Sequence, residues 1–218
     1  MKPGLMFDKC ECMDEKVKEH AWLFSSGYWG GGKRCALLFL PMYDPDVGTR
    51  KERYWCRHNL AMAKEGGYTV GIFNPRKFVR EIYAINKSKE IRSGGAMSPA
   101  YRRTVDELIL EFNSYEHKVE CEHHWVLWYG CFEGEKLVAY IRLIRMGELA
   151  IYARILGHRD HLDNGCMFLM HHIISKALLE LPSPVKYTMY GAWASGGEGL
   201  QFWKKRCQFL PATLPLEK

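Results

Sequence analysis

No stretch of this chain stays apolar for the roughly 18 residues that a membrane-spanning helix needs. The first residues, MKPGLMFDKCECMDEK, also lack the apolar core of a secretory signal peptide. We therefore expect a cytoplasmic protein without a membrane partner. In that compartment the eight cysteines are expected to be mostly reduced thiols rather than a disulfide framework.

The cysteines and histidines lack the spacing that is typical of a zinc site. Paired zinc ligands are usually separated by two or more residues. Three pairs in this sequence are separated by a single residue: Cys10 and Cys12, Cys56 and His58, Cys121 and His123. Buried thiols are the simpler interpretation, and no metal site is predicted.

Charges of the two signs are only mildly unbalanced. The chain has 31 lysines and arginines against 25 aspartates and glutamates, which gives a net charge of +6 and a pI of about 8.8. The densest basic groups lie at 50–53, 87–103 and 204–206. This balance permits a nucleic-acid partner without requiring one, and a small molecule that bears phosphate fits it equally well.

Length and composition indicate one folded domain with an N-terminal extension. A hydrophobic content of 47% and a charged content of 26% are ordinary for a soluble protein that buries a core. Glycines at 27 and 30–32 indicate a flexible loop. We therefore expect an extension over residues 1–34 and a domain over residues 35–218, and no internal repeat is visible.

The most informative part of the chain is a predicted three-stranded meander. Short glycine-containing links at 133–136 and 146–148 separate β-rich runs at 125–132, 137–145 and 149–156. Because the second link is so short, the last two strands should lie side by side and antiparallel.

Periodicity, capping signals and proline positions predict the remaining elements. We expect strands at 35–42, 68–73, 185–193 and 208–214, and helices at 54–64, 76–88, 99–112, 164–181 and 199–207. A polar loop that contains glycines is expected between residues 86 and 101.

From about residue 68 to residue 214, this order of elements resembles the GNAT acyltransferase superfamily and its FemAB-like relatives. The resemblance implies an α/β (α+β) fold with a mixed, mostly antiparallel central sheet flanked by helices. In that superfamily a loop written Q/R-x-x-G-x-G/A binds the pyrophosphate of coenzyme A through N–H groups at a helix start. Arg154 and Gly157 match this motif, whereas Arg159 stands where the family has glycine or alanine.

The resemblance therefore implies acyl-CoA as the cofactor and small-molecule acyl donor. Its expected contacts are Arg154, Ile155, Gly157, Arg159 and Gly165. Arg159 is expected to contact phosphate through its side chain, and Gly165 to supply part of the missing backbone approach.

Acylation of an amine requires a general base, donors that polarise the thioester carbonyl and an acid for the leaving thiolate. Tyr190 occupies the place of the tyrosine that often serves as the acid in this superfamily, and a packed strand aromatic is the alternative. His158 and Asp160 follow the predicted central strand, where a histidine titrates near neutrality and suits the role of base. A structural histidine or a loop cap is the alternative for these two residues.

The polar loop between residues 86 and 101 is the predicted acceptor site. Asn86, Ser88, Arg92 and Tyr101 place polar and aromatic groups on one glycine-containing loop, and binding residues favour such loops. A solvated connector is the competing interpretation.

The function expected from these features is transfer of an acyl group from an acyl-CoA-type donor to an amine. One alternative keeps the fold and acts on nucleic acid, as phage DNA-modification proteins of the Mom type do, or takes its acyl group from aminoacyl-tRNA as FemAB-like transferases do. Another is a binding module without catalysis. The sequence does not indicate the oligomeric state.

Overall fold

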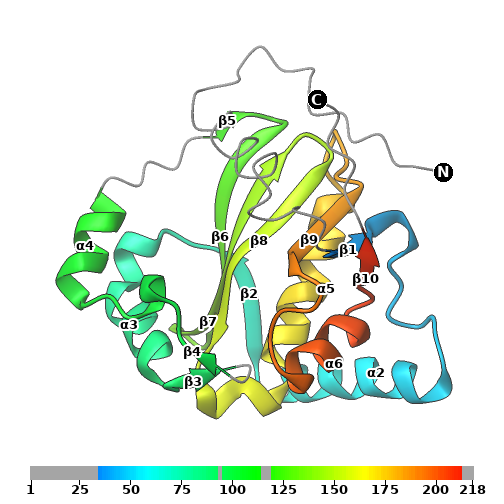
Figure 1. Cartoon of the computed structure of the whole chain (residues 1–218), viewed down its shortest axis with the longest axis horizontal. Helices are drawn as coiled ribbons and strands as arrows, with labels where there is room; N and C mark the ends of the chain where they lie inside the picture. The colour runs from blue at the N-terminus through cyan, green and yellow to red at the C-terminus, as the bar shows by residue number, and fades with distance from the viewer. Residues whose placement is uncertain (1–33, 93–94, 114–118, 213–218) are drawn as a thin grey trace.

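The computed structural model describes residues 34–92, 95–113 and 119–212 (Figure 1). Nearly all of the predicted extension, with Cys10 and Cys12, lies outside the described residues. Within these ranges no helix is long and apolar enough to cross a bilayer.

The described residues form ten strands and five α-helices, and the predicted strands and helices occur in the expected order. The strands are β1 (Cys35–Phe39), β2 (Tyr68–Ile72), β3 (Ile91–Arg92), β4 (Gly95–Ala96), β5 (Val119–Cys121), β6 (His124–Glu133), β7 (Lys136–Met146), β8 (Leu149–Gly157), β9 (Tyr187–Ala192) and β10 (Leu210–Ala212). The α-helices are α2 (Arg50–Glu65), α3 (Val79–Lys87), α4 (Val105–Asn113), α5 (Cys166–Leu179) and α6 (Glu198–Arg206). Short 3-10 helices are η1 (Leu40–Met42), η2 (Pro75–Phe78), η3 (Pro99–Tyr101) and η4 (Arg159–Asn164).

One mixed sheet organises the fold. Its strand order is β10-β1-β9-β8-β7-β6-β2, with β5 paired to β6 beside this path. The pair β8–β9 is parallel, and the other neighbours in the sheet are antiparallel. The predicted meander is confirmed, because β7 pairs antiparallel with both β6 and β8. The expectation of a mixed, mostly antiparallel sheet is confirmed as well.

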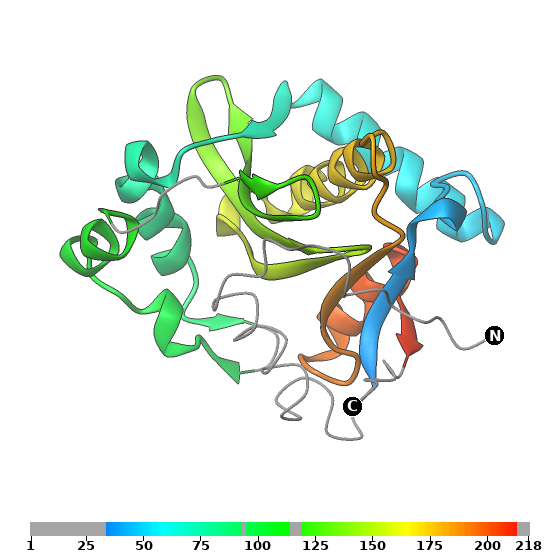
Figure 2. The same ribbon diagram turned by 90° about the horizontal axis from the view of Figure 1, so that it is seen from above.

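Helices cover the sheet on opposite sides, with α2 and α5 on one side and α3 and α4 on the other (Figure 2). Successive strand residues point to opposite faces, so neighbours on a strand join different cores. Tyr129 packs in the core beneath α2 and α5, whereas Trp128 packs in the core beneath α3 and α4. On β7, Ile141 packs in the core beneath α2 and α5, and Tyr140 packs in the core beneath α3 and α4. Both faces of the central strands are therefore buried.

The strand predicted at 35–42 lies in an unexpected place. It forms β1 and then η1, and β1 is inserted between β9 and β10. Leu37 is the partner of Met189 on one side and of Leu210 on the other. The domain that resembles acyltransferases therefore includes a strand from before residue 68.

The predicted helix at 99–112 is wrong in its first half. Residues 99–101 form η3, and α4 begins only at Val105. Thr104 and Glu107 explain this start, because each side chain takes the backbone N–H of the other: Thr104 N donates to Glu107 Oε2 at 2.7 Å, and Glu107 N donates to Thr104 Oγ1 at 3.2 Å. Such a reciprocal cap fixes a helix start more firmly than a serine followed by proline.

The predicted loop between residues 86 and 101 contains a short hairpin, in which β3 pairs with β4 and Ile91 faces Ala96. The predicted helix at 164–181 also differs from expectation. Its first residues belong to η4, which ends at Gly165 in the left-handed region with φ of 75°, and α5 begins at Cys166.

Candidate functional site

The cavity of interest opens where two neighbouring strands separate. The parallel strands β8 and β9 keep register from Leu149 to Ile151. On the other side of β8, Arg142 pairs with Arg154 and Leu143 with Tyr152, so that Ala153 is the extra residue of a bulge. A bulge bends its strand and increases the local twist. The second half of β8 thereby diverges from β9.

A cavity of about 1120 Å³ lies between the diverging strands. Its aromatic lining consists of Trp55, Tyr101, Tyr152, Phe168, Tyr190 and Trp203. Its charged lining consists of Lys89, Arg92, Asp163 and Glu198. A large pocket that combines aromatic walls with a few converging polar groups is the usual form of a small-molecule site.

Two helices begin at the cavity wall. Gly165, Met167 and Phe168 place the first turn of α5 there, and Gly197 and Gly199 do the same for α6. Neither helix has a side-chain cap at its first residue. The first amides of a helix lack intrahelical acceptors, and the helix dipole makes this end attractive to anions. The cavity therefore offers backbone donors from two directions.

Position 165 requires glycine because of its backbone conformation and because of the atoms that surround it. Its φ of 75° favours glycine, and a Cβ at this position would lie 2.1 Å from the carbonyl oxygen of Asn59 in α2. The absence of a side chain lets α2 and the start of α5 come together at the cavity.

Tyr190 lines the cavity from β9. Its ring packs edge-on against Trp203 at 5.5 Å between centroids. Burial raises the pKa of the phenol, so it is protonated at neutral pH. Among the described residues its hydroxyl has no hydrogen-bond partner, which leaves its proton available to a ligand.

Tyr152 also lines the cavity, but its hydroxyl is engaged by a buried histidine. His171 Nε2 lies 3.1 Å from the carbonyl oxygen of Cys207, and His171 Nδ1 lies 3.0 Å from the hydroxyl of Tyr152. Because a carbonyl only accepts, Nε2 carries the proton and Nδ1 accepts from Tyr152. His171 is thus neutral, and its burial lowers its pKa to about 3.

This buried histidine predicts a loss of stability in acid. The unfolded chain binds a proton at His171 near the ordinary pKa of 6.5, whereas the folded protein resists it down to about 3. Between these values the unfolded state binds more protons, so the free energy of unfolding falls as pH falls, by about 1.4 kcal/mol per pH unit and roughly 5 kcal/mol over the window. Urea unfolding of wild type and His171→Gln from pH 7 to pH 3 measures this, and the variant should show the shallower decline.

The matched control for that series is His58→Gln, at an exposed position on α2. It should keep the wild-type dependence on pH. A His171→Gln profile parallel to wild type would show that His171 is not the buried neutral group described here.

Lys204 shapes the loop between β9 and α6. It is 1% exposed, and its ammonium donates to the carbonyl oxygens of Ala192 at 2.7 Å, Ser195 at 2.9 Å and Trp193 at 3.2 Å. Burial lowers its pKa to about 8. The three carbonyls satisfy the charge and fix the loop that leads to the first turn of α6.

Six of the residues predicted as site residues line this cavity. They are Ile155, Gly157, Gly165, Arg92, Tyr101 and Tyr190. The other six, which are Arg154, Arg159, His158, Asp160, Asn86 and Ser88, are not among the lining residues.

Arg154 faces α4 instead of the cavity. Its Nη2 lies 2.6 Å from Glu111 Oε1, and its guanidinium lies 5.9 Å from the ring centroid of Trp128. Glu111 also pairs with Arg103. The first residue of the predicted phosphate motif therefore joins β8 to α4, and its proposed contact with the donor would require Glu111 to release it.

His158 and Asp160 follow the end of β8, with 3.6 Å between His158 Nδ1 and Asp160 Oδ2, and neither is among the lining residues. His158 Nδ1 is 3.4 Å from the amide nitrogen of Asp160 and caps η4. Its ring packs against His161 at 5.8 Å, and burial lowers its pKa. Arg159 is 66% exposed and pairs with Asp160. This group forms the loop cap that sequence reasoning had named as the alternative.

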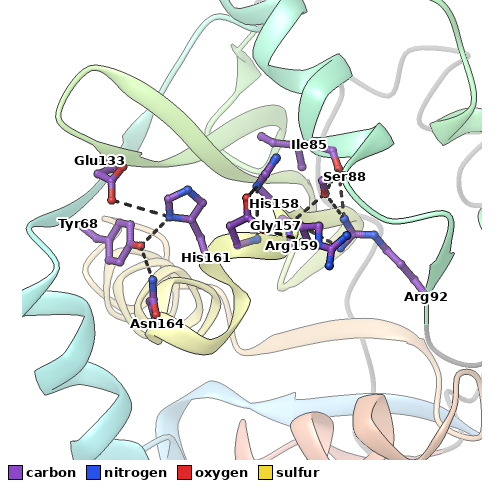
Figure 3. Close-up of polar contacts among 11 residues, drawn as sticks. Tyr68, Ile85, Ser88, Arg92, Glu133, Gly157, His158, Arg159, His161 and Asn164 are labelled. Carbon is purple, nitrogen blue, oxygen red and sulfur yellow. Dashed lines mark hydrogen bonds and ion pairs between the residues drawn. The ribbon is translucent and has the colours of Figure 1, made fainter.

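His161 belongs to a second polar cluster on the side of β2. Tyr68 Oη lies 2.7 Å from His161 Nδ1, and Asn164 Nδ2 donates to the same Tyr68 oxygen at 3.1 Å (Figure 3). Tyr68 Oη accepts from Asn164 and also shares a hydrogen bond with His161 Nδ1. The cluster fastens η4 to β2.

Arg92 fastens the hairpin β3–β4 to the end of β8. Its Nη1 donates to the carbonyl oxygen of Gly157 at 2.9 Å, and its Nη2 donates to Ser88 Oγ at 2.7 Å and to the carbonyl oxygen of Ile85 at 3.2 Å (Figure 3). Ser88 Oγ in turn accepts from the amide of Arg159 at 3.1 Å. Ser88 thus positions Arg92 from outside the cavity. Asn86 is buried and accepts a hydrogen bond of 2.6 Å from Tyr140.

Several lining residues were missed by sequence reasoning. They are Trp55 and Asn59 on α2, Tyr152 on β8, and Glu198 and Trp203 on α6. The α2 residues precede residue 68, where the order of elements predicted from the sequence begins to resemble acyltransferases. Tyr152 and Trp203 lie inside that segment, where both were indistinguishable from core aromatics.

No group of three or more histidines, cysteines, aspartates or glutamates that suits a metal ion occurs in the described part of the chain. Cys35, Cys56, Cys131, Cys166 and Cys207 are free and buried.

No protein-family model matches the sequence, and no curated protein matches it. Solved structures do resemble it. L-PGS from Bacillus licheniformis is 12% identical, with a TM-score of 0.57 over 82% of this chain and 58% of that one. FemX is 11% identical, with a TM-score of 0.56 over 83% of this chain and 60% of that one.

A tandem GNAT protein from the clavulanic acid biosynthesis pathway is 12% identical, with a TM-score of 0.50 over 88% of this chain and 55% of that one. The chain thus spans a little over half the length of each of these proteins. At such identities the similarity shows the fold, which is GNAT-like.

Proposed function

We propose that this protein transfers an acyl group from an acyl-CoA-type thioester to an amine, in the cavity between β8 and β9. The observation that carries the proposal is the cavity itself, in which two uncapped helix starts and a partnerless phenol meet. The GNAT-like fold, found in the tandem GNAT protein, supports it.

The residues at the start of α5 suit the phosphates of such a donor. Gly157 and Gly165 leave the backbone accessible, and the amides after Gly165 are those of a helix start. Lys89 and Arg92 add positive charge to the same cavity. Arg159 is exposed and paired with Asp160, so this part of the site rests on backbone donors rather than on that side chain.

In the proposed reaction the amine nitrogen attacks the thioester carbonyl carbon, a C–N bond forms and the C–S bond breaks. The leaving thiolate takes a proton, and Tyr190 is the proposed donor because its protonated hydroxyl lines the cavity. The amine gives up a proton, and Asp163 and Glu198 are the carboxylates of the lining that suit a base acting directly or through water. His158 and Asp160 are not used, because they lie outside the lining.

Tyr190→Phe should lower kcat by roughly 100-fold while leaving KM for the donor within about twofold, since general acid catalysis contributes about this much. The ring is retained, so binding should persist. Tyr129→Phe is the matched control, because burial also raises the pKa of Tyr129 but this residue is absent from the lining. Equal rates for the two variants would remove Tyr190 from the chemistry.

The experiment that tests the proposed function combines binding and turnover. Calorimetric titration with coenzyme A and acetyl-CoA should give saturable binding with one site per chain. Incubation with acetyl-CoA and a panel of primary amines should then release free thiol and form amides, detected by mass spectrometry. If neither coenzyme A nor acetyl-CoA binds, an acyl-CoA donor is rejected.

A second candidate keeps the chemistry and changes the partners, with aminoacyl-tRNA as donor or a nucleic acid as acceptor. The distribution of positive charge beside the cavity favours it, as described next. In the turnover assay it predicts that small amines are poor acceptors.

A further inference from the structure

Positive charge is concentrated in one segment beside the cavity. Residues 76–103 contain eight lysines and arginines against two glutamates, a net charge of +6. The whole chain also carries +6. The rest of the sequence is therefore electrically balanced, and the excess lies in η2, α3, the hairpin β3–β4, η3 and the start of the link to α4.

Helix α3 arranges part of this charge as a stripe. Val79, Ile82 and Ile85 are buried against the sheet. Lys77 in η2 and Arg80, Ala84 and Lys87 in α3 are exposed, and a spacing of three to four residues places the α3 residues along one side of the helix. Lys89 and Arg102 continue the exposed positive charge toward the cavity. We call these five cations, Lys77, Arg80, Lys87, Lys89 and Arg102, the cationic stripe.

Few structural contacts engage the cations of the stripe, although Lys87 Nζ also lies 5.6 Å from the ring centroid of Tyr83. Among the described residues none of the five forms an ion pair within 4 Å. Lys87 Nζ donates to the carbonyl oxygen of Arg102 at 3.3 Å, which joins the two parts of the stripe. The remaining cations of the segment do have structural partners. Arg76 donates to the carbonyl oxygens of Phe112 and Asn113. Arg92 donates to the carbonyl oxygen of Gly157, and Arg103 pairs with Glu111.

The stripe ends at the cavity mouth. Lys89 belongs to both, and Arg92, Ser98 and Tyr101 line the cavity from the same loop. Tyr101 offers an aromatic ring next to these cations. A row of unpaired cations that leads to an aromatic side chain matches the pattern by which proteins follow a phosphodiester backbone and stack a base.

We propose that the cationic stripe binds a nucleic-acid strand, and that this strand presents the acceptor amine to the cavity. Phosphates contact the five cations of the stripe, and the nucleotide at the mouth stacks on Tyr101. The identification of the strand as acceptor rests on the proposed acyl transfer, whereas the binding itself does not.

A membrane surface is the competing partner for a basic helix face. Helices that lie on membranes place bulky apolar side chains beside their cations, and the exposed apolar residue within the stripe on α3 is Ala84. Ile91 in the hairpin is 64% exposed, so vesicles are included in the test.

The test measures anisotropy of a fluorescent 12-nucleotide single strand, as DNA and as RNA, from 50 to 200 mM salt. The variant carries Lys77→Gln, Arg80→Gln and Lys87→Gln. The control carries Lys64→Gln, Lys176→Gln and Lys205→Gln, which removes the same charge at exposed positions outside the stripe. The stripe variant should bind at least tenfold more weakly, and the slope of log K against log salt should shrink by about 0.7 per lost contact, or about 2 in all.

Equal affinities and slopes for the two triple variants would overturn the proposal. So would the absence of oligonucleotide binding by wild type, or binding to vesicles with anionic lipid but not to either oligonucleotide. Calorimetry with coenzyme A on the same samples separates the two claims, because none of the three substituted stripe residues lines the cavity. If wild type binds coenzyme A but no oligonucleotide, only the proposed role of the stripe is rejected. If wild type binds neither, the proposed acyl-CoA site is rejected as well.

Discussion

A tryptophan in place of Gly199 is expected to abolish donor binding while the protein stays folded. Gly199 lines the cavity in the first turn of α6, and a Cβ built on it meets no atom within 4 Å. The larger side chain therefore enters the space that the donor would occupy. A glycine inside a helix costs up to about 1 kcal/mol relative to alanine, so its replacement should not weaken α6.

Calorimetry with coenzyme A should show at least a 100-fold loss of affinity for Gly199→Trp, and thermal unfolding should give a Tm near that of wild type. Gly199→Ala is the control at the same position, and its small methyl group should leave the affinity for coenzyme A within about threefold of wild type. Tight donor binding by a folded Gly199→Trp protein would place the donor outside this cavity.

Gly165→Ala is expected to cause the largest loss of stability among single glycine replacements at the site. The added Cβ would lie 2.1 Å from the carbonyl oxygen of Asn59, and the backbone has φ of 75°. The left-handed conformation alone costs an alanine about 1–2 kcal/mol. Because the contact is with backbone, α2 or α5 must also move, and the free energy of unfolding should fall by roughly 3 kcal/mol or more.

Gly67→Ala separates these two contributions. Gly67 has a similar φ of 67°, but a Cβ there meets nothing within 4 Å. Urea unfolding should show a loss of about 1 kcal/mol for Gly67→Ala, which reflects backbone strain only. If both variants lose the same amount, the close packing of α2 against Gly165 is not a constraint on the fold.

Local signals in the sequence predicted most of the fold. The turns after β6 and β7 each contain a glycine with positive φ, Gly134 at 60° and Gly147 at 59°, and these residues set the meander. Apolar spacing predicted α3, α5 and α6 to within a few residues. The start of α4 is marked in the sequence by the capping pair Thr104 and Glu107, which the predicted helix at 99–112 did not take into account.

The position of β1 was not predictable in the same way. Its sequence, CALLF, indicates a buried strand, but its partners Met189 and Leu210 lie more than 150 residues away. A pairing over that distance depends on the assembled sheet and leaves no local pattern. For the same reason the contribution of α2 to the cavity was missed, since Trp55 reaches it through packing of α2 on α5 and α6.

The phosphate motif predicted donor contacts, and only some of its residues lie at the cavity. Ile155, Gly157 and Gly165 are among the lining residues. Arg154 is not among them, and its guanidinium pairs with Glu111 of α4. A carboxylate 43 residues earlier in the chain cannot be recognised as a partner from spacing alone. His158 was predicted as the general base from its place after the strand. Its hydrogen bond at the start of η4 could not be recognised from the sequence.

The claim that the cavity between β8 and β9 takes the acyl donor is tested most directly by hydrogen–deuterium exchange with and without coenzyme A. The account predicts slower exchange at the amides of residues 166–169 and 197–200, which begin α5 and α6 at the cavity wall. The amides of β10 and of the C-terminal half of α5 should be unchanged. Saturating coenzyme A that protects neither helix start, or that protects only segments outside the cavity lining, would contradict the account.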